Sequence, residues 1–393
     1  MKVADIARAV ESLAPLALAE EWDNVGLLVG DRDAEVRRML VCTDLTEAVL
    51  AEAVAAQAQM VLAHHPVIFK GVPRVTADET PVVYEALRRG IAVYAAHTNF
   101  DAAPGGPSDV LADVLGLADR RPLEPIVRRD LCKLVVFAPP EQLGVLADTA
   151  FSAGAGRIGR YRDCSFFCHG IGSFFGEVGA RPAVGQAGRQ EFAEEVRLEV
   201  VCPRAKAPAV VEALRAAHGY EMPAIDTYAL EDFPPDCGHG RIGRLTRPAT
   251  VQTLLNRLKK AVGVRDLLLA VATGEGEGDG GPKGGRKGRT GRKGDGKRGD
   301  GRGKLVTTAA TFGGSAGGSW RRAVGAGATF LVTGEMRHHD ALDAAAAGLT
   351  VACLGHGHSE RLAMRRLAER LASQLRGLTT LASHRDEDPF AVV

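Results

Sequence analysis

The sequence lacks several features that would assign it to a class of proteins at once. No apolar run approaches the roughly 20 residues that a membrane-spanning helix needs, and the first residues show an amphipathic helix pattern in place of a basic, apolar leader. The formal net charge is only +1 in 393 residues, so no general attraction to nucleic acid or to a membrane is expected. These absences favour a globular protein whose partners are neither membranes nor nucleic acids.

A disulfide framework is absent as well. The seven cysteines are odd in number and scattered, mostly inside apolar, strand-like runs. This usage predicts free thiols and a cytoplasmic location. Cys164, Cys168 and His169 lie close together, but the aromatic residues between them favour a core strand over a structural zinc site.

The patterns that are present predict an α/β protein with an insertion. Residues 1–126 alternate strand and helix patterns, and the alternation resumes in residues 233–393, which predicts two α/β halves that form one domain with parallel strands. Residues 127–232 follow the order β-α-β-β-α-β instead. We therefore expect a separate ferredoxin-like α+β domain inserted between the halves.

The second half is interrupted by a segment of unusual composition. Residues 274–303 contain fourteen glycines, nine Lys or Arg and five Asp or Glu, with no large apolar side chain. Such a segment cannot bury a core, so a disordered, solvated tether is expected. Weak binding of RNA through its basic residues is the alternative, which the lack of aromatic residues for base stacking disfavours.

Two adjacent histidines follow one of the buried strand patterns. His64 and His65 come directly after three apolar residues, and Pro66 ends the strand. Neighbouring side chains on an extended segment point in opposite directions, so this pair suits two ions, or one ion and an outer partner, better than one shared ion. The alternative is a pair of partly buried histidines that hydrogen-bond nearby carbonyl groups.

Further polar residues follow other strand patterns of the same kind. His97 and Asp101 come after the next strand, and His356 and Glu360 come after the last one, four residues apart across a helix start. Ligands bind at the carboxyl ends of parallel strands, so these side chains are candidates for an N/O metal site. The alternatives are that Asp101 only forms a turn, that His97 is an outer partner, and that Ser359 simply caps the helix.

Taken together and in order, these segments resemble the motifs of one family. It is the NGG-interacting-factor-three-like family, often labelled GTP cyclohydrolase 1 type 2 homologue. The motifs that carry the resemblance are residues 21–27, 64–66, 97–101, 333–335 with 338–339, and 355–360. The resemblance covers roughly residues 1–120 and 240–380, and the inserted domain is similar to a PII-like (CutA-like) domain through residues 218–223.

The resemblance implies a dinuclear metal centre in a homohexameric toroid. Its implied ligands are His64, His65, Asp101, His356 and Glu360. A set of imidazoles and carboxylates without thiolates suits two divalent ions per chain of the type Zn, Fe, Mn or Co. His358 departs from the family pattern, and it could be a further ligand or an outer proton acceptor.

These residues predict a metal-dependent hydrolase that acts on a small molecule, with a nucleotide as one option. The family label implies opening of the purine ring of GTP by a metal-bound water. Proton transfer is assigned first to His338, with Glu335 and His97 as the other candidates for the catalytic role. The alternative is a non-enzymatic assembly that stores, senses or delivers metal, with the inserted domain as its regulator.

Overall fold

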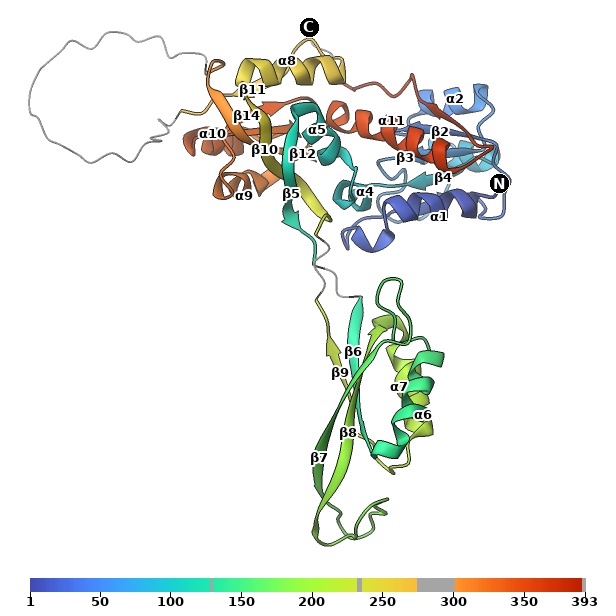
Figure 1. The fold of residues 1–393 in the computed structure, drawn as a ribbon. Helices are drawn as coiled ribbons and strands as arrows, with labels where there is room; N and C mark the ends of the chain where they lie inside the picture. The colour runs from blue at the N-terminus through green and yellow to red at the C-terminus, as the bar shows by residue number, and fades with distance from the viewer. Residues whose placement is uncertain (128–129, 232–234, 274–300, 391–393) are drawn as a thin grey trace, which may run out of the picture. The chain divides into compact units, whose positions relative to one another are not determined.

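The computed structural model describes residues 1–127, 130–231, 235–273 and 301–390 (Figure 1). The chain divides into two compact units, which are residues 1–126 with 235–393, and residues 127–234. Most of the predicted tether, residues 274–300, lies outside the described residues. Its last residues are described, and there the carbonyl of Arg302 accepts a hydrogen bond from the backbone of Gln252 at 2.9 Å.

One sheet of the first unit has the strand order β1-β4-β3-β2-β15. Its strands are β1 (Gly26–Val29), β2 (Arg38–Cys42), β3 (Met60–Ala63), β4 (Ala92–Ala95) and β15 (Thr379–Ala382). All pairs are parallel except β1 with β4. Every residue of β3 and β4 is buried, as expected for central strands of a parallel sheet that helices cover on both faces.

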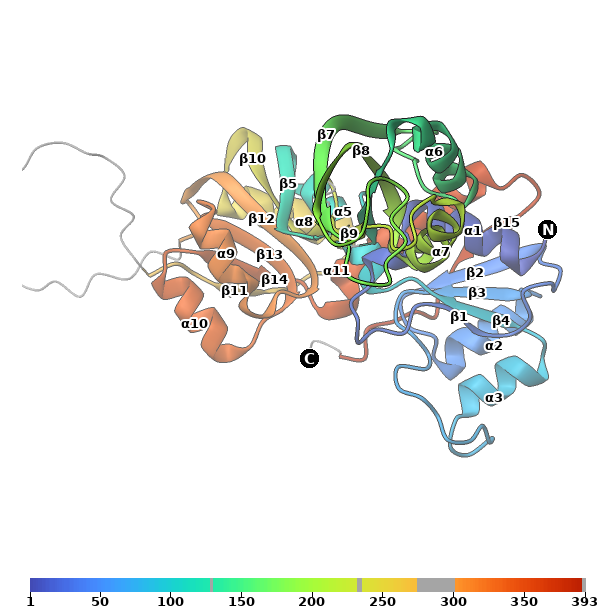
Figure 2. The same cartoon turned by 90° about the horizontal axis from the view of Figure 1, so that it is seen from below.

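Helices cover the two faces of this sheet. On one face lie α2 (Glu47–Ala55) and α3 (Pro81–Arg88) (Figure 2). These helices bury Val49, Leu50 and Val83 against the strands. On the other face lie α1 (Val3–Leu13) and α11 (His356–Gln374). Local sequence signals fix where the helices of the first face begin, because the Thr46 side chain caps α2 and Pro81 is the first residue of α3.

The other sheet of this unit has the order β11-β14-β13-β12-β10-β5. Its strands are β5 (Leu117–Pro125), β10 (Gly238–Thr250), β11 (Leu268–Ala270), β12 (Leu305–Ser315), β13 (Phe330–Glu335) and β14 (Thr350–Cys353). Strands β12, β13 and β14 run parallel. The helices around it are α4 (Thr98–Ala102), α5 (Pro107–Leu115), α8 (Val251–Val262), α9 (Trp320–Gly325) and α10 (His338–Ala346).

The two α/β halves exchange strands, which the sequence analysis did not predict. Strand β5 comes from the first half and pairs with β10 of the second sheet, whereas β15 comes from the C-terminal end and pairs with β2 of the first sheet. Both are edge strands of their sheets. β5 carries charged residues and two prolines, so its hydrophobic pattern is weak. Strands β1 and β10 and helix α4 were also not predicted.

The second unit contains one antiparallel sheet in the order β7-β8-β6-β9. Its elements are β6 (Leu131–Ala138), α6 (Leu143–Ser152), β7 (Ser165–Phe175), β8 (Gln190–Pro203), α7 (Ala207–Ala217) and β9 (Ile225–Ala229). This is the β-α-β-β-α-β connection of ferredoxin-like domains. The segment around Cys168 is a strand as predicted, but Phe166 and Phe167 are exposed rather than part of the core.

Short 3-10 turns complete the chain at Leu16–Leu18, Pro140–Gln142, Arg204–Lys206 and Gly317–Ser319. Among the helices of the described ranges, none combines the length and the apolar composition needed to cross a membrane.

Candidate metal centre

The predicted ligands converge on one place in the first unit, between its two sheets. His64 and His65 directly follow β3, and Asp101 lies in the short helix α4 after β4. His356 and Glu360 lie in the first turns of α11, directly after β14 of the other sheet. The cluster therefore forms where the carboxyl ends of parallel strands from two sheets meet, rather than at the edge of one sheet.

Three overlapping groups of ligand atoms could each hold a metal ion. In each group the atoms lie within 4.8 Å of one another. The groups are His64, Asp101 and Glu360; His65, His356 and Glu360; and His64, His65 and His97. Glu360 is shared by the first two groups, which is the position that a bridging carboxylate would occupy.

The two adjacent histidines take different partners around Glu360. His64 Nε2 lies 3.5 Å from Asp101 Oδ1 and 3.7 Å from Glu360 Oε1. His65 Nε2 lies 3.2 Å from Glu360 Oε2. This arrangement is the one expected if each histidine serves its own ion, and the imidazole rings are 5.0 Å apart between centroids.

Buried polar atoms without hydrogen bonds support the fit of a cation. Within the described residues, His64 Nε2, Asp101 Oδ1 and Glu360 Oε2 are buried and make no hydrogen bond, although each lies near an oppositely charged group of the cluster. An unsatisfied buried polar atom costs about 1–3 kcal/mol, so three of them at one point indicate that another group normally completes the site. Imidazole and carboxylate donors without thiolate fit Zn, Fe, Mn or Co.

The charges of the cluster are strongly coupled. Burial alone would lower the pKa of the His65 imidazole, but the carboxylates of Asp44 and Glu360 raise it to about 10. Burial would raise the pKa of Glu360, yet His64 and His65 hold it well below its usual range. Burial raises the pKa of Asp101. Imidazoles must be neutral to bind a metal, so binding here should release protons.

Outer hydrogen bonds fix the imidazole rings. His64 Nδ1 lies 2.8 Å from the carbonyl of Ala96, and His65 Nδ1 lies 2.8 Å from Asp44 Oδ1. His356 Nδ1 lies 3.2 Å from Glu335 Oε1. In each case the Nδ1 contact leaves Nε2 as the nitrogen for a ligand, which is the usual arrangement around metal-bound histidines.

His97 is held in the same way, by a carboxylate that sequence reasoning did not single out. Its Nδ1 lies 2.9 Å from Asp23 Oδ1, and its ring lies 5.3 Å from the rings of both His64 and His65. Burial would raise the pKa of Asp23, but hydrogen bonds from His97 and Thr98 lower it to about 2. Asp23 is therefore ionised and able to stabilise a protonated His97.

Asp44 was missed as well, although a signal for it exists. It is the second residue after β2, just as His65 is the second residue after β3, so the strand-end rule applied to the histidines would have found it. Asp23 lies in the segment 21–27 that contributed to the family resemblance, but nothing local connects it to His97.

Other predicted residues lie away from the cluster or face other partners. His338 and His339 are exposed at the start of α10, and their rings contact each other at 5.4 Å. Within the described residues, no hydrogen bond, ion pair or ring contact joins His338 to the cluster. His358 Nδ1 lies 3.0 Å from Asp388 Oδ2. Ser359 is no simple cap, because its hydroxyl accepts a hydrogen bond from the Gly314 backbone at 2.9 Å.

Gly314 brings the last residues of β12 directly against the cluster. Its φ is +62°, and a Cβ at this position would lie 2.5 Å from Glu360 Oε1. A side chain there would strain the backbone and push the Glu360 carboxylate away. Gly314 therefore lets the chain approach the ligands closely.

We expect Gly314→Ala to weaken metal binding and to lower the free energy of unfolding by about 1–3 kcal/mol. The matched control is Gly327→Ala, because Gly327 also has a positive φ of +84° but no atom within 4 Å of the added Cβ. Isothermal titration with Zn or Mn and thermal melts of both variants check this. Equal metal affinity in the two variants would show that Glu360 is not displaced.

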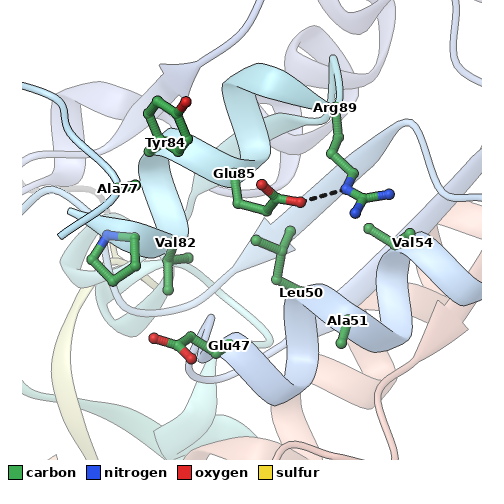
Figure 3. A pocket seen from close by; sticks show the side chains of 10 residues that line it. Glu47, Leu50, Ala51, Val54, Ala77, Val82, Tyr84, Glu85 and Arg89 are labelled. Carbon is green, nitrogen blue, oxygen red and sulfur yellow. Dashed lines mark hydrogen bonds and ion pairs between the residues drawn. The ribbon is translucent and has the colours of Figure 1, made fainter.

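An open cavity adjoins the cluster. Its volume is about 370 Å³, and its lining includes Asp44, His65, Val67 and Val72. A second cavity of about 560 Å³ lies between α2 and α3, where the Glu85–Arg89 ion pair of 2.6 Å lies in its wall (Figure 3). None of the residues of the three ligand groups lines this second cavity, whereas His65 lines the smaller one.

Comparison with known proteins agrees with this architecture. The sequence profile of the family described as Duf34/NIF3 (NGG1p interacting factor 3) matches residues 1–278 and 294–389. A Bacillus subtilis protein named GTP cyclohydrolase 1 type 2 homolog is 32% identical over 391 residues, which are 98% of this chain and 97% of that protein. A Mycobacterium tuberculosis protein of the same name is 40% identical over 294 residues, which are 71% of this chain and 77% of that protein.

Solved structures show the same fold. A Bacillus cereus protein related to NIF3 has a TM-score of 0.69 at 30% identity, with 100% of this chain and 99% of that chain covered. The Staphylococcus aureus protein SA1388 has a TM-score of 0.78 at 25% identity, with the same coverage. Both likenesses extend over the mixed α/β architecture as a whole, including the second unit.

Proposed function

Because this chain belongs to the Duf34/NIF3 (NGG1p interacting factor 3) family and its histidines and carboxylates converge on one cluster, we propose that it is a metal-dependent hydrolase of a small molecule. The main support is the set of buried, unsatisfied atoms of His64, Asp101 and Glu360, which lies beside an open cavity that His65 also lines. A purely structural metal site would not need that cavity.

The proposed centre holds two divalent ions per chain. One ion would take His64, Asp101 and Glu360, and the other would take His65, His356 and Glu360. The donor set favours Zn, Fe, Mn or Co. Two such ions would supply Lewis acidity to a scissile bond and would lower the pKa of a water molecule.

The protein's own residues would move the proton. His97 is the best placed, because Asp23 holds its Nδ1 and leaves Nε2 to accept a proton next to His64 and His65. Asp23 would then stabilise the imidazolium, as the acidic member of a catalytic triad does. Glu335 is the second candidate through its contact with His356. His338 stays a prediction that its exposed position does not support.

The substrate would lie in the cavity beside His65. The apolar wall of the cavity includes Leu45, Val67 and Val72, and its carboxylates are Asp44 and Glu79. No lysine or arginine is among the described residues of this lining. Any phosphate groups of a nucleotide would therefore lie toward the metal ions, and an uncharged ring would lie in the cavity. The name of the relatives makes GTP the first compound to test.

The direct test combines metal analysis with a substrate screen. Purified protein should contain about two first-row ions per chain. The loaded protein is then incubated with GTP, other nucleotides and simple phosphate esters in the presence of Zn, Mn or Fe, and products are followed by chromatography. Hydrolysis of at least one compound is expected. If every compound fails with all three metals while metal is bound, the non-enzymatic metal-binding role is the better description.

We extend the proposal to assembly and location from the family resemblance. We propose a homohexameric toroid whose inserted unit is a PII-like domain, and light scattering should give the mass of a hexamer of the 41.4 kDa chain. A monomer mass would contradict this. The seven free cysteines are compatible with a reducing, cytoplasmic location.

A further inference from the structure

The segment after β15 lies next to the loop that follows β2, which supports the candidate metal centre. β15 runs parallel to β2, with Ala382 paired to Val41, so the chain leaves both strands at the same edge of the sheet. The Ser383 backbone then donates to the Val41 carbonyl at 2.8 Å, and the Ser383 hydroxyl donates to Glu52 at 2.5 Å. These bonds fix the start of the segment next to the loop that follows β2.

Asp386 is the buried carboxylate of this segment, and it contacts the loop after β2 and helix α11. Its Oδ2 accepts a hydrogen bond from the Thr43 backbone at 2.7 Å, and its Oδ1 lies 3.5 Å from the Asp44 backbone nitrogen. The same Oδ2 lies 3.3 Å from Nε of Arg361. The side chain is only 2% exposed, so these contacts replace solvent.

Each contact of Asp386 leads to one candidate ligand. The loop of Thr43 and Asp44 supports His65 twice, because the Thr43 carbonyl accepts from the His65 backbone at 2.9 Å and Asp44 holds the His65 ring at 2.8 Å. Arg361 directly follows Glu360 in α11. His65 follows β3 of one sheet, and Glu360 lies in α11, which follows β14 of the other sheet. The two residues are far apart in the sequence, so the chain between them does not fix their distance.

We infer that Asp386 is a positioning residue, which sets the distance between His65 and Glu360 by bracing the loop after β2 against α11. This inference rests on the proposed function, since it assumes that these two side chains bind metal. The effect on metal affinity should resemble that of other outer partners of metal ligands, about 10–100-fold.

The test is metal binding by full-length Asp386→Asn, measured as competition with a chelator for Zn and for Mn. Asparagine keeps the shape and one acceptor oxygen but removes the charge. We expect affinity to fall about 10–100-fold. The matched control is Glu387→Gln, because Glu387 is the exposed neighbour, and it should bind metal like the wild type.

A melt of each metal-free variant separates positioning from general stability. A lower melting temperature with unchanged metal affinity would overturn the inference. If the wild type binds no metal, the proposed function fails instead, so the two failures are distinct. Asp386 should act on His65 through Asp44, so Asp386→Asn and Asp44→Asn should have non-additive effects on metal affinity. Strictly additive effects would contradict this path from Asp386 through Asp44 to His65.

A second variant covers the case in which Asp386→Asn does not fold. Asp44→Asn leaves Asp386 in place and removes the negative charge from the contact that holds the His65 ring. It should also weaken metal binding about 10–100-fold. Wild-type affinity in this variant would overturn the path from Asp386 to His65.

Discussion

Glu360→Gln protein should lose both metal ions at once. Glu360 is the carboxylate common to two of the ligand groups. Its side chain is only 3% exposed, so its position is closed to other ligands from the solvent. A lost outer partner already costs about 10–100-fold in affinity, and the loss of a direct, shared ligand should exceed about 100-fold for each ion. Elemental analysis after dialysis measures the occupancy.

The control for this experiment is Glu369→Gln. Glu369 lies on the same helix but is exposed, so the change of charge is the same and the cluster is untouched. Asp101→Asn provides a graded comparison, because Asp101 belongs to only one group and should release one ion preferentially. Equal loss of both ions in Asp101→Asn, or full occupancy in Glu360→Gln, would contradict the shared position of Glu360.

His97→Gln should lower turnover by about 10²–10⁴-fold, the usual contribution of a positioned acid or base. Glutamine can still accept a hydrogen bond but cannot carry the proton. Asp23→Asn should reproduce part of the effect, because the Asp23 carboxylate holds His97 Nδ1 at 2.9 Å and would stabilise its charged form. The measurement is kcat for the substrate identified in the screen, with metal occupancy determined on the same samples.

His338→Gln is the comparison that decides between the candidates for proton transfer. Its exposed ring should allow wild-type turnover if His97 is the carrier. Glu335→Gln should act mainly on metal affinity, since Glu335 contacts the ring of His356. A large loss of turnover in His338→Gln, together with normal turnover in His97→Gln, would reverse the assignment.

The parts of the fold with strong local signals were predictable from the sequence. The strand β3 before His64 was predicted because its residues are all apolar, and all four of them are buried. β5 and β15 were missed for the opposite reason. β5 mixes charges with two prolines, and β15 has only four residues, so their pairing depends on partners far away in the sequence.

The same distinction applies to the site. Four of the site residues, His64, Asp101, His356 and Glu360, can be grouped from the sequence, because each follows a strand and the carboxyl ends of parallel strands meet. The contacts of Asp23 with His97 and of Asp386 with the loop of Thr43 could not be predicted, since those pairs are 74 and 343 residues apart. Such contacts appear only when the chain is folded.

The exchange of edge strands has a consequence for synthesis of the protein on the ribosome. β2 pairs on one side with β3, which is made soon afterwards, and on the other with β15, which is made much later. Until residues 379–382 emerge, the apolar strand β2 is an open edge that can pair with other chains. Chains that end before β15 should therefore aggregate during translation, and chaperones should bind them longer than they bind chains that include β15.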